Sequence, residues 1–257
     1  MYAEERQQAI AGLVTRNRRV SVSQAAEAFS VTTETVRRDL AILEQQGLVR
    51  RVHGGAVSAD ALTMLEPNVP ERDRAAAEQK DRIAKAAVAM LPPGGGSIVL
   101  DAGTTTGRLA AVLPTDRRLT VVTNGVAVAA LLTGRAFPQV DVHLLGGRVR
   151  AISQATVGAS ALSALDDIRA DVAFLGTNGL HLEHGLTTPD ADEAAVKAAM
   201  IRAGRRVVVL ADSRKFGEET MVRFGTLDLI DAVITDDGVD EADVKTLESS
   251  DIEVVVA

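Results

Sequence analysis

The feature that most constrains this 257-residue chain is a series of short, unbroken aliphatic runs in its second half, separated by segments with helical periodicity. Val207-Val208-Val209-Leu210 is typical of them. A strand that is apolar on both faces is buried on both faces, and helices between such strands supply the crossovers of a parallel sheet. We therefore expect a parallel α/β domain with strands at residues 97–100, 119–122, 140–145, 172–175, 206–210, 232–235 and 252–256.

Composition limits the chemistry of the chain. Aromatic residues make up only 2% and tryptophan is absent, so the cores must be aliphatic. Because there is no cysteine, disulfides, thiolate metal sites and thiol nucleophiles are excluded. Glu4, Glu5 and Arg6 stand where a signal peptide needs an apolar run, and no stretch reaches membrane-spanning length, so we expect a cytoplasmic protein with no membrane partner.

Charge divides the chain into a basic head and an acidic body. Residues 1–57 hold eight Lys and Arg against six Asp and Glu, a net charge of +2, which leaves −9 for residues 58–257. Such a division indicates that only the head meets a polyanion. Pro67 and Pro70, with no sustained periodicity around them, predict a linker at residues 58–74, and the length suits a second domain at residues 75–257.

The head has the pattern of three helices followed by a hairpin. Apolar spacing predicts a first helix over residues 4–14, a second that Ser23 can cap and that ends near Ser30, and a third capped by Thr32 or Thr33. Gly47 would stop the third helix. The branched residues 48–52 and the turn after them predict a small wing.

The third helix carries side chains suited to DNA. With Val36, Leu40 and Leu43 facing inward, Thr35, Arg37 and Arg38 fall on the sides and outer face of its N-terminal half, the part that enters a major groove. Arginine grips guanine or phosphate, and threonine contacts bases and backbone. Taken alone, an isolated arginine pair is more typical of a solvated helix face than of a DNA contact.

A longer sequence pattern favours DNA binding over a solvated helix face. It comprises Thr33-Glu34-Thr35-Val36-Arg37-Arg38-Asp39-Leu40, Leu43-Glu44, Gly47-Leu48-Val49 and Arg51-Val52-His53-Gly54-Gly55-Ala56, and it closely resembles the DeoR family of bacterial regulators. The resemblance implies a winged helix-turn-helix that binds a double-stranded DNA operator. The side chains expected at DNA are Thr32, Thr33, Thr35, Arg37, Arg38, Arg50, Arg51 and His53. We interpret Asp39 as the structural partner of a nearby arginine.

In the second domain, Asp101-Ala102-Gly103-Thr104-Thr105-Thr106 lies between a strand and a helix, where free amides and hydroxyls suit a phosphate. An ordinary connecting turn that binds no ligand has the same composition. The loop lacks the lysine of a Walker motif and the glycines of a dinucleotide fingerprint, so we expect no nucleotide cofactor. More polar residues follow other strands, at the edge where parallel sheets gather ligands: Thr123, Asn124, Gly146, Gly147, Arg148, residues 176–179 and residues 212–217.

These landmarks, with Glu193-Ala194-Ala195-Val196-Lys197 and Lys215-Phe216-Gly217, resemble the DeoR effector domain, which is akin to phosphosugar isomerases. The similarity covers nearly the whole chain and is closest to members that control sugar phosphotransferase genes, including fructose uptake. It implies a phosphorylated sugar held at Gly103 to Thr106, with Lys197 and Lys215 near the sugar. Glu193 and Lys197 also have the spacing of a surface helix pair.

Catalysis by the second domain is a competing function. Asp101, Glu193, Asp212 and Lys215 are candidate groups for acid-base catalysis, but no deaminase-like set of histidine and carboxylate accompanies them, so binding without turnover is favoured. An architectural DNA-binding protein needs broad basic surface, which the body lacks. His181 and His184 resemble a metal pair but have no third ligand nearby in the sequence, and His143 in a strand is interpreted as structural, so no metal is expected.

We therefore predict a transcriptional repressor of sugar uptake or catabolism genes, relieved by a phosphorylated sugar and not an enzyme. One winged head seldom supplies enough contact for a unique site, so a homodimer or homotetramer is expected.

Overall fold

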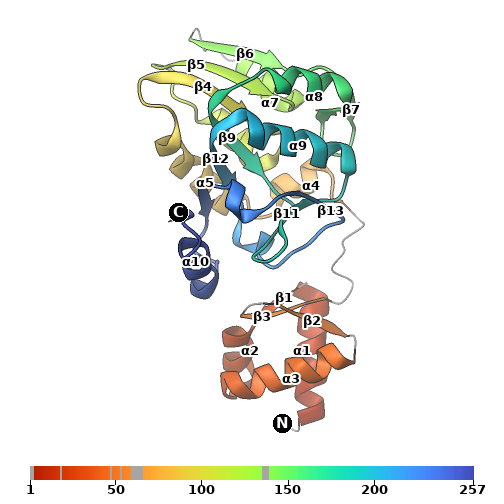
Figure 1. Ribbon diagram of the computed structural model, residues 1–257. Coiled ribbons are helices and arrows are strands. Elements are labelled where there is room, and N and C mark those ends of the chain that lie inside the picture. Colours follow the sequence, from red (N-terminus) through yellow and green to blue (C-terminus); the bar gives the residue numbers. More distant parts are fainter. Residues whose placement is uncertain (1–2, 18, 47, 53, 59–65, 135–138) are drawn as a thin grey trace.

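The computed structural model describes residues 3–17, 19–46, 48–52, 54–58, 66–134 and 139–257 (Figure 1). The expected fold class is confirmed, with a small winged helix-turn-helix and a larger domain built on a parallel sheet. The head consists of α1 (Ala3–Asn17), β1 (Arg19–Ser21), α2 (Val22–Phe29), α3 (Thr33–Gln45), β2 (Val49–Val52) and β3 (Gly55–Ser58).

An aliphatic core holds the head together. Its largest fully buried side chains are Ile10 from α1 and Leu40 and Leu43 from α3. The three strands form an antiparallel sheet in the order β1-β3-β2. Gly55 is required in this sheet because a Cβ there would lie 2.1 Å from the carbonyl oxygen of Val20.

Capping fixes the helix boundaries of the head. Thr32 caps α3, as expected, by accepting from the amide of Thr35. The expectation that Ser23 caps α2 is wrong, because Ser21 does so, and Gln24 completes a capping box with it. The helix ends at Ser30, which adopts a left-handed φ of 53°. Gly47 lies outside the described residues.

The second domain alternates strands and helices. Its helices are α4 (Val69–Arg74), α5 (Ala77–Ala87), α6 (Thr104–Ala111), α7 (Val126–Gly134), α8 (Ala159–Asp166), α9 (Ala191–Ala203) and α10 (Glu241–Glu248), with 3-10 turns at Val88–Met90, Ser213–Lys215 and Leu227–Leu229. No described helix is long and apolar enough to cross a bilayer.

Seven parallel strands form the main sheet, in the order β15-β14-β12-β9-β4-β5-β6. They are β4 (Gly95–Leu100), β5 (Arg118–Thr123), β6 (Val140–Leu144), β9 (Ala170–Gly176), β12 (Gly204–Leu210), β14 (Ala232–Thr235) and β15 (Glu253–Val256). Each of them coincides with one of the seven aliphatic runs, so this expectation is confirmed.

The sheet separates two cores. Val208 and Leu210 pack with α5, α6 and α7, whereas Val207 and Val209 pack with α8 and α9 on the other face. This alternation along one strand is why the runs are apolar throughout. Five short strands were not predicted: β7 (Arg148–Arg150), β8 (Ala155–Val157), β10 (Gly179–His181), β11 (Gly185–Thr188) and β13 (Val222–Gly225).

The segment expected to be a linker contains α4. Asn68 and Glu71 form a capping box at its start, and Pro70 lies in its first turn, where a missing amide costs little. The helix packs against α6. Residues 69–74 of the expected linker are therefore helical and lie against the second domain.

Candidate functional site

The two arginines of α3 are exposed to solvent. The side chains of Arg37 and Arg38 are 59% and 79% exposed, and each lies 3.7 Å from a carboxylate oxygen of Glu34. Exposed pairs at this distance contribute little energy, so both guanidinium groups are available to another anion. Thr33 is exposed beside them, whereas the hydroxyls of Thr32 and Thr35 lie 2.8 Å apart at the helix cap.

The other expected contacts of the head lie on the wing. Arg51 is exposed on β2, and its backbone amide donates to Glu44 Oε1 at 2.8 Å. Arg50 lies in the same strand, but its side chain and the whole of His53 are outside the described residues. Asp39 has the structural role expected of it, because its buried carboxylate accepts from Arg6 Nε at 2.6 Å and from Gln7 at 2.9 Å, tying α3 to α1.

A cavity of about 500 Å³ opens at the carboxyl ends of β4, β9 and β12. Six of the expected effector residues line it: Asp101, Gly103, Thr104, Thr105, Lys197 and Lys215. The cavity is also lined by residues from α4 and the segment before it, from α5, and from the loop that follows Lys215. Convergence at this edge is confirmed for the loops after β4, β9 and β12.

One wall of the cavity is the N-terminus of α6. No side chain caps this end of the helix, whose first residue is Thr104. Lys80 of α5 reaches it, with Nζ 2.9 Å from Thr104 Oγ1, and also donates to the carbonyl of Arg72. Uncapped amides, a hydroxyl and an ammonium therefore meet at one point, which is the donor set a phosphate uses.

Burial disfavours the charged forms of two lysines that line the cavity, Lys80 and Lys215. Burial lowers the pKa of Lys80 to about 8, against the attraction of Asp212. Burial also lowers the pKa of Lys215, and Asp212 again opposes the shift. The Lys215 ammonium lowers the pKa of Lys80 further, and the guanidinium groups of Arg214 and Arg72 lower that of Lys215 further, so a bound dianion would favour the charged forms of both lysines.

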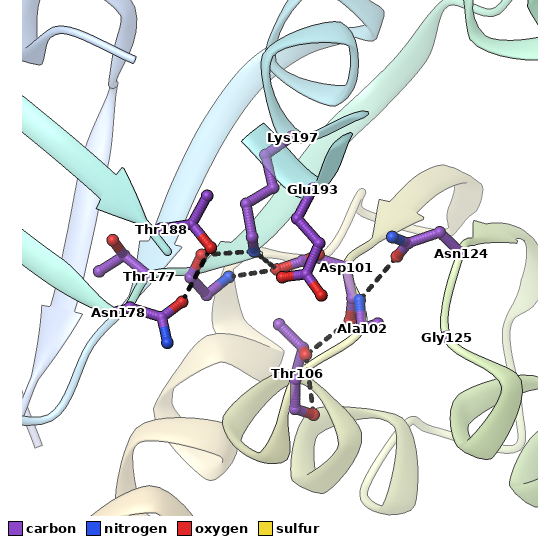
Figure 2. A network of polar contacts seen from close by, with 12 residues as sticks. Asp101, Ala102, Thr106, Asn124, Gly125, Thr177, Asn178, Thr188, Glu193 and Lys197 are labelled. Carbon is purple, nitrogen blue, oxygen red and sulfur yellow. Dashed lines mark hydrogen bonds and ion pairs between the residues drawn. The ribbon is translucent and has the colours of Figure 1, made fainter. Parts of the chain in front are cut away.

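The cavity also holds a buried ion pair. Asp101 and Lys197 are in direct contact, and Lys197 Nζ also donates to the Gly176 carbonyl at 3.0 Å. Burial raises the pKa of Asp101, although the Lys197 ammonium opposes that shift. Lys197 and Glu193, one turn apart on α9, both point toward Asp101 (Figure 2). Both are buried, so they are not a surface helix pair.

Three expected effector residues support the loop between β4 and α6 from behind. The Thr106 hydroxyl donates to the Asp101 carbonyl at 2.6 Å, and Asn124 Oδ1 accepts from the Ala102 amide at 2.8 Å (Figure 2). The Thr123 hydroxyl accepts from the Gly125 amide. All three are buried and outside the cavity lining, so they hold the loop in shape and do not face a ligand.

The expectation for Gly146, Gly147 and Arg148 is not met, because all three are exposed and lie outside the lining. Gly147 adopts a φ of 134°, and a Cβ there would lie 2.5 Å from the Val157 carbonyl oxygen, so it serves the turn into β7. Arg148 pairs with Asp192 at 2.6 Å on the surface.

A carboxylate ahead of α4 belongs to the site and was missed. The Glu66 side chain is 3% exposed, and its oxygens lie 2.6 Å from Arg150 Nη1 and 3.6 Å from Arg72 Nη1. Arg150 also binds Asp190 and Glu193. Nothing in the spacing of Glu66 indicates this network, whereas Lys80 had a detectable signal: it shares the buried stripe of α5 with Ile83, Ala84 and Ala87.

Family models match both halves of the chain. The DeoR-like helix-turn-helix domain matches residues 6–61, and the DeoR C-terminal sensor domain matches residues 75–237. The chain belongs to the DeoR family. It is a transcriptional regulator with a DNA-binding head and a sensor domain, as the resemblance implied.

Relatives align over most of their length. The chain is 36% identical to an uncharacterized HTH-type transcriptional regulator, FruR, of Bacillus subtilis over 92% of both chains. It is 35% identical to the glycerol-3-phosphate regulon repressor of Escherichia coli, again over 92% of both. A distant structural neighbour is ribose 5 phosphate isomerase A of Neisseria gonorrhoeae, with 16% identity and a TM-score of 0.39 over 54% of this chain and 53% of the isomerase.

Proposed function

We propose that this chain represses genes of sugar uptake or catabolism and releases its operator when a phosphorylated sugar binds the sensor. Support comes from the family and from relatives named as repressors, one of them for a glycerol-3-phosphate regulon. The observation that carries the proposal is the meeting of Lys80 with the uncapped N-terminus of α6 inside the cavity.

In this proposal the phosphate accepts from the first amides of α6, from Thr104 and Thr105, and from the ammonium groups of Lys80 and Lys215. The sugar hydroxyls face Asp101, Lys197 and Asn178, which also line the cavity. A free sugar offers nothing to the cationic end, so the site discriminates by charge. Thr106, Thr123 and Asn124 position the loop.

Transmission to the head is proposed to run through the segment ahead of α4. Glu66 and Arg72 line the cavity, and Glu66 is held by Arg150. A dianion close to Arg72 competes with Glu66 for that guanidinium, because both are negative. Asn17, at the end of α1, also lines the cavity, so head and connecting segment both border the ligand. Binding and DNA affinity are then linked reciprocally.

We propose that the head binds double-stranded DNA through Thr33, Arg37, Arg38 and Arg51, with Arg50 and His53 of the wing adding phosphate contacts. Thr32 and Thr35 stabilise the start of α3. Two heads are needed for a specific operator, so the working form is a homodimer or homotetramer, and its place is the cytoplasm. The domain limits proposed are residues 1–57 for the head and 75–257 for the sensor.

We propose further that the sensor binds without turnover. Asp101, the carboxylate that follows β4 in the cavity, is paired with Lys197 and accepts from the Gly176 amide through the same oxygen, so it is engaged in a structural ion pair and is a poor general base. Incubation of the protein with each sugar phosphate, followed by chromatography, should return the compound unchanged. Accumulation of an isomer or of a deaminated product would contradict this point.

A melting-temperature screen tests the sensor. Fructose 1-phosphate, fructose 6-phosphate and glycerol 3-phosphate are compared with fructose and glycerol, because a ligand that binds only the native state raises the melting temperature. We expect shifts from phosphorylated compounds only, and their loss in Thr105→Val and Lys215→Ala. Thr133→Val, at an exposed position of α7, is the matched control. Equal shifts from free and phosphorylated sugars would refute the site.

Release of a labelled operator by the compound that gives the largest shift tests the coupling. Light scattering on the same sample gives the oligomeric state. A sugar phosphate that stabilises the sensor but leaves operator affinity unchanged would refute the repressor mechanism while leaving the binding site intact.

A further inference from the structure

Outside the cavity, a second group of polar side chains converges at the tip of the β10–β11 hairpin. His181 is the last residue of β10, and His184 lies in the three-residue turn before Gly185. Glu219 reaches them from the segment between the 3-10 turn at Ser213–Lys215 and β13. The sequence pattern offered no third ligand near the histidines, and the fold supplies one from 35 residues further along the chain.

The geometry of this trio fits a small cation. Glu219 Oε1 lies 3.6 Å from His181 Nδ1 and 3.4 Å from His184 Nε2. Neighbouring ligand atoms of a tetrahedral zinc site lie about 3.3 Å apart, given bonds of about 2.0–2.1 Å. All three ligand atoms lie within 4.8 Å of one another, so a small rotation of one histidine closes the set.

The three side chains are also prepared for binding. His181 and Glu219 are 12% and 13% exposed, whereas His184 is 55% exposed and can turn. His181 Nδ1 accepts from the amides of Glu183 and His184 at 3.2 and 3.3 Å, so it carries no proton and can bind a cation after exchanging two long hydrogen bonds. Two imidazoles and one carboxylate are a ligand set that zinc uses, with water in the fourth position.

We propose that His181, His184 and Glu219 form a site for a divalent d-block cation such as zinc. The cation clamps the hairpin to the loop of the effector cavity. The Gly217 amide already donates to the Leu180 carbonyl at 2.9 Å, and the Thr220 amide donates to the Thr187 hydroxyl at 3.0 Å. Lys215, Glu218 and Thr220 line the cavity, so a cation on Glu219 fixes the segment that carries them.

Cobalt(II) is the probe, because its visible absorption reports tetrahedral coordination by nitrogen and oxygen. Untagged, metal-stripped protein is titrated with CoCl₂ and then with ZnCl₂ as a competitor. We expect one Co²⁺ per chain with micromolar affinity, displaced by Zn²⁺. His184→Ala and Glu219→Gln should each weaken binding at least about tenfold. His143→Ala is the matched control, since His143 pairs with Asp141 on exposed β6.

His184 is exposed, so its replacement keeps the fold, and equal melting temperatures of the metal-free proteins verify this. Undiminished Co²⁺ binding in His184→Ala and Glu219→Gln would mean adventitious binding and would overturn the proposal. Absence of binding in the wild type would leave the trio as a hydrogen-bonded cluster and would overturn it too.

Hydrogen exchange tests the clamp without any effector. Zn²⁺ should slow amide exchange in residues 216–220 of the wild type and not of His184→Ala. Unchanged exchange in metal-loaded wild type would refute the clamp. An effect of Zn²⁺ on sugar-phosphate affinity rests on the proposed function. Because Co²⁺ titration and exchange need no sugar, failure of the sensor assignment and failure of the metal site give different results.

Discussion

Arg37 and Arg38 stand mostly in solvent on α3, whereas Lys80 and Lys197 beside the cavity are 3% and 5% exposed. We propose that both regions bind phosphate groups, but the cations of α3 are exposed and those of the cavity are buried. An exposed guanidinium is charged at every physiological pH and costs the fold almost nothing. A buried ammonium loses its hydration, which disfavours the charged form, and the pKa of Lys80 therefore falls to about 8.

This difference matches the two ligands that we propose. DNA is a long polyanion, and an exposed row of cations binds it through the release of counterions, with little demand on geometry. A sugar phosphate is one small anion that must be told apart from similar compounds. Buried donors of fixed direction provide that selectivity, because each of them is left unsatisfied by a ligand of the wrong shape.

The largest expected effect is on the exposed side. Replacing Arg37 and Arg38 together by Ala should cost about 2–4 kcal/mol of operator affinity, roughly 30- to 1,000-fold, and lower the salt slope by about two. Fluorescence anisotropy at several salt concentrations measures both. Arg202→Ala, at an exposed position of α9, is the control. Unchanged affinity at fixed salt would remove α3 as the recognition helix.

The buried side is tested with Lys215→Met. Loss of a charge-assisted bond should weaken sugar-phosphate binding by about 1.5–3 kcal/mol, roughly 10- to 150-fold. The free protein should be no less stable, because methionine avoids the desolvation of an ammonium and Asp212 keeps its bond to Arg214 at 2.8 Å. Calorimetric titration and thermal melting measure the two quantities, with exposed Lys245→Met as the control. A large loss of stability would mean that Lys215 is structural.

The same contrast explains what the sequence could predict. Periodicity located all seven strands of the main sheet because each is an aliphatic run with both faces buried, as in Val207 to Leu210. The short strands β10, β11 and β13 were not predicted, because three or four residues are too few to show a hydrophobic periodicity. The exposed face of α3 was predicted well, since it follows from helical geometry alone.

The cavity was predicted in part. Residues in the loops that follow strands, such as Gly103 after β4 and Lys215 after β12, were found because the carboxyl edge of a parallel sheet collects its loops. Glu66 was missed because its role depends on Arg150, 84 positions away in the chain. Arg148 was included because a Gly-Gly-Arg loop after a strand looks the same in sequence whether it turns toward the ligand or toward solvent.

The pH dependence of the two regions should differ as well. Lys80 has a pKa of about 8 in the free protein, and a bound dianion favours its charged form, so binding takes up a proton above that pH. Affinity for the sugar phosphate should therefore fall about tenfold from about pH 7 to about pH 9, where the phosphate itself stays a dianion. Operator affinity should stay nearly constant. Titration calorimetry at both pH values measures this.

Lys80→Met checks the assignment, because it should bind more weakly at neutral pH and lose most of the pH dependence. A wild-type affinity that does not change between the two pH values would show that Lys80 does not meet the phosphate.

The smallest effect is expected from salt on the sensor. Buried cations in a cavity are screened far less than exposed ones, and a small ligand has no condensed counterions to release. Raising salt from about 50 to 200 mM should therefore weaken sugar-phosphate binding less than about threefold, while operator affinity falls by orders of magnitude. If sugar-phosphate affinity fell with salt concentration as steeply as operator affinity, the phosphate would have to bind exposed cations. Arg148, paired with Asp192 on the surface, would then be the first candidate, and Arg148→Ala would abolish the slope.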